Sequence, residues 1–153
     1  MPPTETHARL SGDLLVARKA QDKPAILLLG TILAEVKERV RVIENEEKRE
    51  VADSDVIDVL RKAIKRRRES AEQYDKAARP ELAQRERDEI TAIERYLPAA
   101  VDPEVIRGAV REAIAGGLTA VGPVMGRVLG RFKGQVEGSV VNAIVREELA
   151  RNA

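Results

Sequence analysis

Residues 53–80 read DSDVIDVLRKAIKRRRESAEQYDKAARP, and this stretch decides the fold. Its apolar residues recur every three or four positions, which is the period of a helix with one buried side and not the period of a strand. They are Val56, Val59, Leu60, Ala63, Ile64, Ala71 and Tyr74. Asp53, Ser54 and Asp55 offer a capping side chain and place acids at the positive end of the helix dipole. The stretch therefore predicts a long helix over about 53–78, with Pro80 in the first turn of the next helix.

The same period continues on both sides of this stretch, and no run alternates as a strand would. Asn45 to Ala52 is strongly charged and is either a loop or a frayed continuation of the helix before it. Asp102, Gly116-Gly117 and Ser139 have the residue types that begin or end helices. The sequence predicts an all-α fold, with a four-helix N-terminal part followed by a small three-helix C-terminal bundle. Besides 53–78, the predicted helices are 10–21, 24–44, 80–97, 103–115, 121–132 and 139–149.

Composition changes after Pro98, which marks a candidate domain boundary. Residues 1–98 hold 20 basic and 20 acidic residues, whereas residues 99–153 hold 7 and 6. The second segment also contains eight of the ten glycines. We therefore expect an N-terminal helical domain over 1–98 and a three-helix domain over 99–153.

The composition excludes several functional classes. There is no Cys, and the single His, His7, lies in a polar terminus where we expect neither structure nor a role. No Gly-x-Ser-x-Gly turn, Walker loop or dinucleotide fingerprint is present, so we predict no catalytic residue, cofactor or metal. The longest apolar run, 26–34, is too short to span a bilayer, and no secretory signal opens the chain. We expect a cytoplasmic protein with no membrane partner.

A basic cluster on the helix predicted over 53–78 is the first candidate for phosphate contacts. It consists of Lys62, Lys65, Arg66, Arg67 and Arg68. One interpretation is a stripe that contacts nucleic-acid phosphates. The other is a solvated face whose cations pair with Glu69, Glu72 and the acids of the neighbouring helix, because residues 53–98 have no net charge.

Glycines recur every four residues at positions 122, 126, 130, 134 and 138, and the first three share one face of a predicted helix. Each glycine inside a helix costs about 1 kcal/mol relative to alanine. Such a cost indicates that something approaches the backbone closely: either a tightly packed neighbouring helix or an RNA backbone. A membrane dimer is disfavoured because Arg127 and Arg131 interrupt the segment.

The charge around these glycines is one-sided. Residues 113–136 contain three basic residues, Arg127, Arg131 and Lys133, and no acidic residue. We therefore take Arg127, Arg131 and Lys133, together with Gly126 and Gly130, as candidate RNA-binding residues. Phe132 could stack on a base but is expected in the core.

Several motifs in order resemble those of the GatB/YqeY family. The stretch from Val56 to Ser70 is similar to a signature helix of that family, and 74–80 contains a Lys-Ala-x-Arg-Pro turn. Tyr96-Leu97-Pro98 matches the family's Tyr-Leu-Pro, and 124–142 matches its end. The resemblance spans about 10–150, and the free-standing YqeY-like members of the family have this length.

This resemblance implies an all-helical fold and a possible connection to tRNA. The related domain forms the tail of the B subunit of glutamyl/aspartyl-tRNA amidotransferases, where it helps to hold the tRNA body. The catalytic domains of those enzymes have no counterpart here, so the family's label of carbon–nitrogen ligase with glutamine as donor is not expected of this chain alone. Family members usually carry a basic residue in the loop before the last helix. Loop 134–139 has none, which leaves Arg127, Arg131 and Lys133.

Three hypotheses follow. The first is a non-catalytic accessory module that binds tRNA, or an RNA-containing assembly, through its C-terminal domain. The second is a protein–protein interaction module without RNA binding. The third is an enzyme whose missing groups come from a partner.

Overall fold

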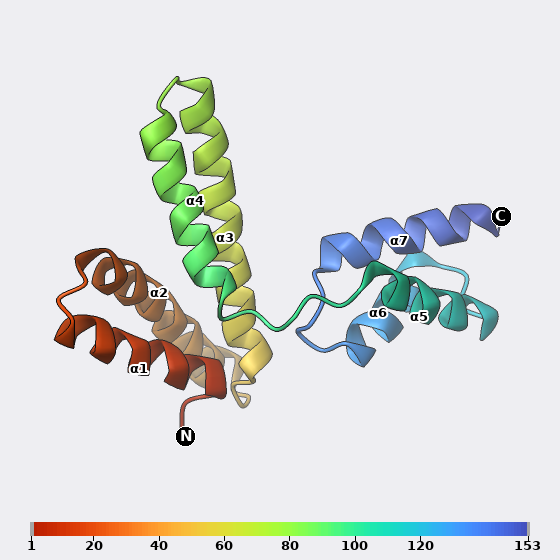
Figure 1. The fold of residues 1–153 in the computed structure, drawn as a ribbon. Coiled ribbons are helices and arrows are strands. Elements are labelled where there is room, and N and C mark those ends of the chain that lie inside the picture. The colour runs from red at the N-terminus through yellow and green to blue at the C-terminus, as the bar shows by residue number, and fades with distance from the viewer. Residues whose placement is uncertain (1, 153) are drawn as a thin grey trace. The chain divides into compact units, whose positions relative to one another are not determined.

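A computed structural model describes residues 2–152, and within that range the chain is helical with no strand. This confirms the all-α prediction. A π-helical turn, η1 (Ile43–Glu47), continues the second helix. None of the helices in 2–152 has an apolar stretch long enough to span a bilayer. The helices are α1 (Glu5–Lys19), α2 (Lys23–Val42), α3 (Asp53–Lys76), α4 (Pro80–Glu94), α5 (Pro103–Ala115), α6 (Val121–Arg131) and α7 (Gly138–Arg151), as labelled in Figure 1.

The chain divides after Leu97 into an N-terminal unit, which contains α1 to α4, and a C-terminal unit, which contains α5 to α7. In the N-terminal unit, α1 and α2 form one helical hairpin, and α3 and α4 form another (Figure 1). The core includes Ile32, Val36 and Leu60, which are at most 1% exposed. Small residues such as Ala71 and Ala83 are buried where α3 lies against α4, which lets the two helices pack closely.

Helix α1 begins at Glu5, five residues before the predicted start, and the expectation of an unstructured N-terminus around His7 is wrong. The reason is a partner from a distant part of the chain. The Asp53 carboxylate accepts hydrogen bonds from the Thr6 backbone N–H at 2.9 Å and from Thr6 Oγ1 at 2.7 Å. These bonds satisfy donors that the first turn of a helix leaves free. His7 is half-buried, and its burial and the nearby Lys37 lower its pKa.

The segment that connects α2 to α3 is held by a π-helical turn and by side-chain contacts. It begins with η1, whose Ile43 is fully buried, and Lys48 ends the turn with a left-handed backbone at φ 53°. Asp55 accepts a hydrogen bond from the Ala52 backbone N–H at 2.8 Å and pairs with Arg49 at 2.8 Å. Asp55 therefore caps α3, while Asp53 caps α1.

Helix α4 packs along α3 although its apolar stripe is thin, with a charged run over 85–89 between Leu82 and Ile90. Ala83 is fully buried, and Ile90 is 7% exposed. Arg67 of α3 also pairs with Glu89 of α4 at 2.7 Å. The stripe is thin because alanine contributes little to an apolar pattern even where it is buried.

The C-terminal unit has a core of short aliphatic side chains. Asp102 caps α5 by accepting from the Glu104 N–H at 2.9 Å, and Gly117 follows the end of α5 with φ 106°; both agree with the sequence prediction. The predicted cap at Ser139 is wrong, because α7 begins at Gly138 without a side-chain cap. The core residues that are at most 2% exposed are Ile106, Val110, Ala113, Val124, Val128, Val141 and Val145.

Candidate nucleic-acid interface

Helix α6 has one buried and one open face. Val124 and Val128, one turn apart, are at most 1% exposed and face the core of the C-terminal unit. Because successive helical residues turn by about 100°, the row of Gly122, Gly126 and Gly130 lies opposite this buried side. All three glycines are exposed. The row is therefore an outward strip of helix backbone with no side chains on it.

No atom lies within 4 Å of the position that a Cβ would take at Gly122, Gly126 or Gly130, once the backbone of α6 itself is set aside. This contradicts the interpretation that a neighbouring helix packs tightly on the row. Close packing among the described residues therefore does not account for the low helix propensity of these glycines. The alternative, a molecule outside the chain that approaches the row, stays a prediction.

Two of the three candidate cations, Arg127 and Lys133, are exposed and not paired. Within residues 2–152, no carboxylate lies at ion-pair distance from Arg127 or Lys133. Arg131 differs, because it pairs with Glu112 of α5 at 2.7 Å and lies 5.6 Å from the centre of the Phe132 ring. Glu112 stands one residue before the 113–136 window that contains no acid, so the sequence pattern missed this partner.

Phe132 is half-buried and packs against the C-terminal core with Met125 and Leu129. This confirms its expected place in the core. The candidate surface, which we call the α6 outer face, therefore consists of the exposed row of Gly122, Gly126 and Gly130 with Arg127 beside it, together with Lys133 in the turn that follows the end of α6. It can offer cations to phosphates and close approach to a backbone, and it has no free aromatic ring for base stacking.

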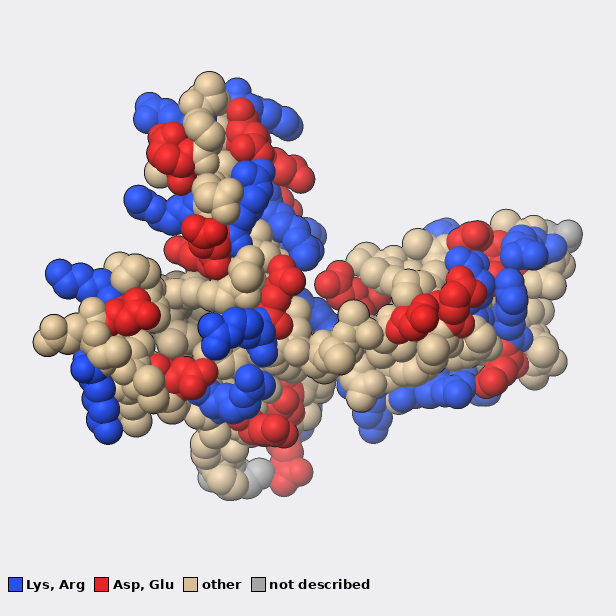
Figure 2. Space-filling view, in the orientation of Figure 1, with Lys and Arg blue, Asp and Glu red and all other residues tan. Residues whose placement is uncertain are grey.

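The basic cluster on α3 is partly engaged in contacts inside the N-terminal unit. Arg66 donates to both oxygens of Glu35 of α2 at 2.7 Å. Arg67 is only 13% exposed; it pairs with Glu89 of α4 and donates to the Ala63 carbonyl at 3.0 Å. Acids of neighbouring helices were one of the partner sets expected of a solvated face. Figure 2 shows Lys and Arg interleaved with Asp and Glu along the α3–α4 hairpin.

The other three members of the cluster, Lys62, Lys65 and Arg68, are exposed. None of them has a carboxylate of residues 2–152 at ion-pair distance. They share the α3 surface with acids such as Asp58 and Glu69, so their field is partly cancelled. Nor do His, Asp and Glu side chains of the described chain form any group of three that could hold a metal ion.

Comparison with known protein families shows to which family the chain belongs. The family described as Yqey-like protein matches residues 7–149. The chain belongs to the YqeY-like family. This confirms the resemblance found in the order of the sequence motifs.

A curated relative of this YqeY-like chain is the uncharacterized protein C22F3.15 of Schizosaccharomyces pombe. The two are 33% identical over 85 residues, which is 56% of this chain and 66% of the relative. The matched part of the YqeY-like chain thus spans about two thirds of the length of the relative.

The Tyr-Leu-Pro motif of the YqeY-like chain has a structural role at the end of α4. The Tyr96 hydroxyl donates to the Asp13 carboxylate of α1, and the Arg9 guanidinium lies 5.1 Å from the centre of the Tyr96 ring. Burial, together with the hydrogen bond to Asp13, raises the pKa of Tyr96 to about 12. The motif therefore ties the last turn before the domain boundary to the first helix.

Sequence reasoning missed a buried ion network in the C-terminal unit. Glu148 of α7 is 2% exposed and accepts from Arg107 at 2.7 Å and from Arg111 at 3.1 Å. Hydrogen bonds from Arg111 and Arg107 lower the pKa of Glu148 to about 2. A signal was present, because Glu148 continues the apolar stripe of Val141, Ile144 and Val145 at helical spacing.

Proposed function

We propose that this YqeY-like chain is a non-catalytic, cytoplasmic accessory module that binds tRNA through the α6 outer face. The observation that carries the proposal is the combination on that face of open backbone and unpaired cations. Gly126 and Gly130 have open space where a Cβ would stand. Arg127 and Lys133 have no carboxylate of residues 2–152 at ion-pair distance.

This geometry suits the recognition of a nucleic-acid backbone. Because no side chain rises from the glycine row, a sugar–phosphate strand can lie against the helix. Arg127 flanks the row, and Lys133 lies in the turn after α6 ends at Arg131. Contacts of this kind position an RNA by its shape and its phosphates and do not read its bases. We expect little preference for sequence and a strong dependence on salt.

The proposed role of the chain is to bind tRNA, and it includes no amidotransferase chemistry. An amidotransferase assembly remains one place where a tRNA-binding module of this family would act. Carbon–nitrogen ligase activity in the purified chain would contradict the proposed role.

The test is a salt titration of tRNA binding with matched variants of the full chain. Arg127→Glu combined with Lys133→Glu reverses two exposed cations on the α6 outer face. Lys62→Glu combined with Lys65→Glu makes the same change of net charge on the exposed side of α3. Fluorescence anisotropy of labelled bulk tRNA at several salt concentrations measures both affinity and salt dependence.

We expect the α6 variant to lose at least about tenfold in affinity at low salt, and the α3 variant to change by much less. The slope of log K against log salt should fall by about two in the α6 variant, since each lost phosphate contact removes nearly one unit. An equal loss in both variants would mean that net charge alone drives binding, and would overturn the assignment to α6. Circular dichroism verifies that both variants remain folded.

A protein partner is the second candidate, favoured by exposed apolar side chains on the first hairpin. Leu15 and Val16 of α1 are 57% and 65% exposed, and Leu27 of α2 is 73% exposed. If the unmodified chain does not bind tRNA at low salt, binding of a protein partner becomes the favoured function. Loss of a stable complex with a purified partner on Leu27→Gln would then support it.

A further inference from the structure

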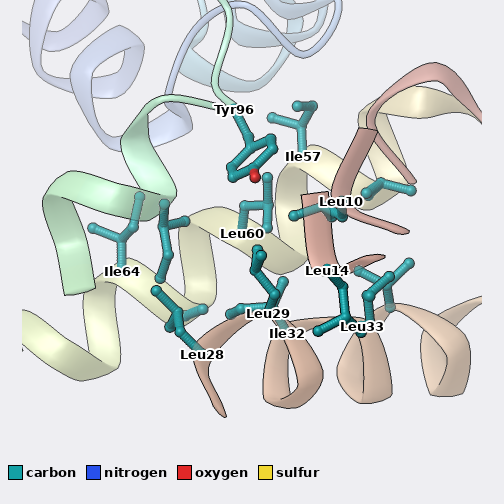
Figure 3. Close-up of a cluster of buried hydrophobic side chains, with 14 of the residues drawn as sticks. Leu10, Leu14, Leu28, Leu29, Ile32, Leu33, Ile57, Leu60, Ile64 and Tyr96 are labelled. Atoms are coloured by element: carbon teal, nitrogen blue, oxygen red, sulfur yellow. The ribbon is translucent and has the colours of Figure 1, made fainter. Parts of the chain in front are cut away.

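The N-terminal unit contains an apolar cavity of about 90 Å³. It lies where α1, α2, α3 and the end of α4 meet, and Figure 3 shows most of the side chains that surround it. Among residues 2–152, Arg95 is the only charged residue that lines it. The other lining residues are Leu10, Ala25, Leu28, Leu29, Ile32, Leu60, Ala92, Ile93 and Tyr96.

The lining favours an apolar occupant. A water molecule needs two or more polar partners to be held inside a protein, and cavities lined by aliphatic and aromatic side chains stay dry. The side chains around an empty cavity also forgo dispersion contacts that an apolar group would restore. An apolar cavity of about 150 Å³ accepts benzene, so in proportion this one accommodates a branched group of about four carbon atoms.

The cavity opens between the first turn of α2 and the last turn of α4. Ala25 and Ala92 are half-buried there, and Arg95 is exposed. No carboxylate within residues 2–152 lies at ion-pair distance from Arg95. Asp13 is already engaged by the Tyr96 hydroxyl, and Arg9 lies over the Tyr96 ring. Arg95 is thus the lining residue whose charge is not engaged by a carboxylate of residues 2–152.

We propose that this cavity binds a short branched aliphatic carboxylate. The branched chain enters among Leu28, Leu29 and Leu60, and the carboxylate lies at the Arg95 guanidinium. A carboxylate there gains a charge-assisted hydrogen bond, which a neutral ligand of the same shape lacks. The site lies wholly within the N-terminal unit and does not depend on RNA binding by α6.

Tyrosine fluorescence offers a direct test, because the chain contains two Tyr and no Trp. In the full chain with Tyr74→Phe, Tyr96 on the cavity wall is the remaining fluorophore. Titration with isovalerate should change its emission in a saturable manner. Acetate, which lacks the branched chain, and isoamyl alcohol, which lacks the charge, should each bind at least about tenfold more weakly.

Two variants test where isovalerate binds. Ala92→Leu fills the opening and should weaken isovalerate binding at least about tenfold, whereas Ala34→Leu adds the same side chain at an exposed position of α2 and should not. Arg95→Gln should remove the preference for isovalerate over isoamyl alcohol. If Ala92→Leu fails to fold, Ala25→Val narrows the same opening from α2.

Each outcome decides the proposal. The proposal is supported if isovalerate binds saturably, if Ala92→Leu or Ala25→Val abolishes this binding, and if the Arg95→Gln chain binds isovalerate and isoamyl alcohol equally well. Absence of saturable binding, or unchanged binding to the folded Ala92→Leu chain, overturns the site. If the chain with Arg95 in place binds isovalerate and isoamyl alcohol with equal affinity, the proposal that the ligand is a carboxylate is wrong. None of these results depends on whether the tRNA proposal holds.

Discussion

The two units of this chain are held together in different ways. The N-terminal unit buries leucine and isoleucine side chains from four helices, and its arginine–carboxylate pairs lie mainly at the surface. The C-terminal unit buries mostly valine, alanine and isoleucine from three helices and adds one carboxylate, Glu148, at the α5–α7 contact. Replacing a buried ion pair with apolar side chains is often neutral for stability, whereas removing one partner leaves an uncompensated buried charge and is destabilising.

This difference also bears on where the chain is open to a partner. In the C-terminal unit the ion network ties α5 to α7, and Val124 and Val128 fix the inner side of α6. The α6 outer face is left without cover. On α3, by contrast, Arg66 and Arg67 are engaged by acids of neighbouring helices. Lys62, Lys65 and Arg68 of α3 are also unpaired, but they share their surface with acids such as Asp58 and Glu69. What distinguishes the α6 outer face is therefore the open glycine row beside its cations.

The largest expected effect comes from removing a core side chain in the smaller unit. Ile106→Ala should lower the free energy of unfolding of the C-terminal unit by about 2–5 kcal/mol, because Ile106 is 2% exposed. A three-helix bundle of this size has little stability to spare, so much of it should unfold. Hydrogen exchange followed by mass spectrometry would resolve the two units.

The matched change in the larger unit is Leu60→Ala, where the side chain is fully buried. We expect a similar loss of free energy but a smaller unfolded population, because that core is larger. If either substitution unfolded both units to the same extent, the two units would not differ in stability as described above.

Next in size is the effect of Glu148→Gln, which removes the acceptor charge of the buried network. The pKa of Glu148 is lowered from 4.5 to about 2 in the folded chain. Its contribution is therefore fully present above about pH 4.5 and is lost as the pH falls toward 2. Thermal unfolding of the C-terminal unit at pH 7 and pH 3 should show a lower midpoint at pH 7 and a weaker dependence on pH in the variant. An unchanged dependence on pH would assign the acid sensitivity to other carboxylates.

A stabilising change of intermediate size is expected on the α6 outer face. Gly126→Ala and Gly130→Ala should each add about 1 kcal/mol to the stability of the C-terminal unit, because the added Cβ meets no atom within 4 Å. Gly30→Ala on α2 is the matched control, since that glycine also faces open space. If the two α6 changes stabilise the chain and also weaken tRNA binding, the glycines serve the partner. Destabilisation by either α6 change would indicate an unexpected close contact.

The smallest effects concern exposed ion pairs. Arg131→Ala and Arg66→Ala each break a pair in which the arginine side chain is more than half exposed. Each should change stability by less than about 1 kcal/mol, as is typical of surface pairs. Chemical denaturation at low and high salt measures both. A larger loss for Arg131→Ala would point to its contact with Phe132 as an additional anchor of α6.

The helices could be predicted from the sequence because each has a local signal, such as the apolar period of α3 or the proline that opens α4. Features that depend on distant partners could not. Asp53 looks like a cap for its own helix and instead caps α1, and Glu112 neutralises a cation on another helix. For the candidate site, the spacing of the glycines indicated a shared face. Only the structure could show that this face is open.

Because Asp53 caps α1 from a later part of the chain, the order of synthesis affects when α1 can complete its contacts. Helix α1 leaves the ribosome before the rest of the N-terminal unit, yet the partner of Thr6 follows 47 residues later and the partner of Asp13 follows 83 residues later. Until Tyr96 emerges, the nascent chain cannot complete the contacts that hold α1. We therefore expect the N-terminal unit to reach its native state only after Tyr96 has been translated, with the apolar sides of α1 and α2 incompletely covered until then.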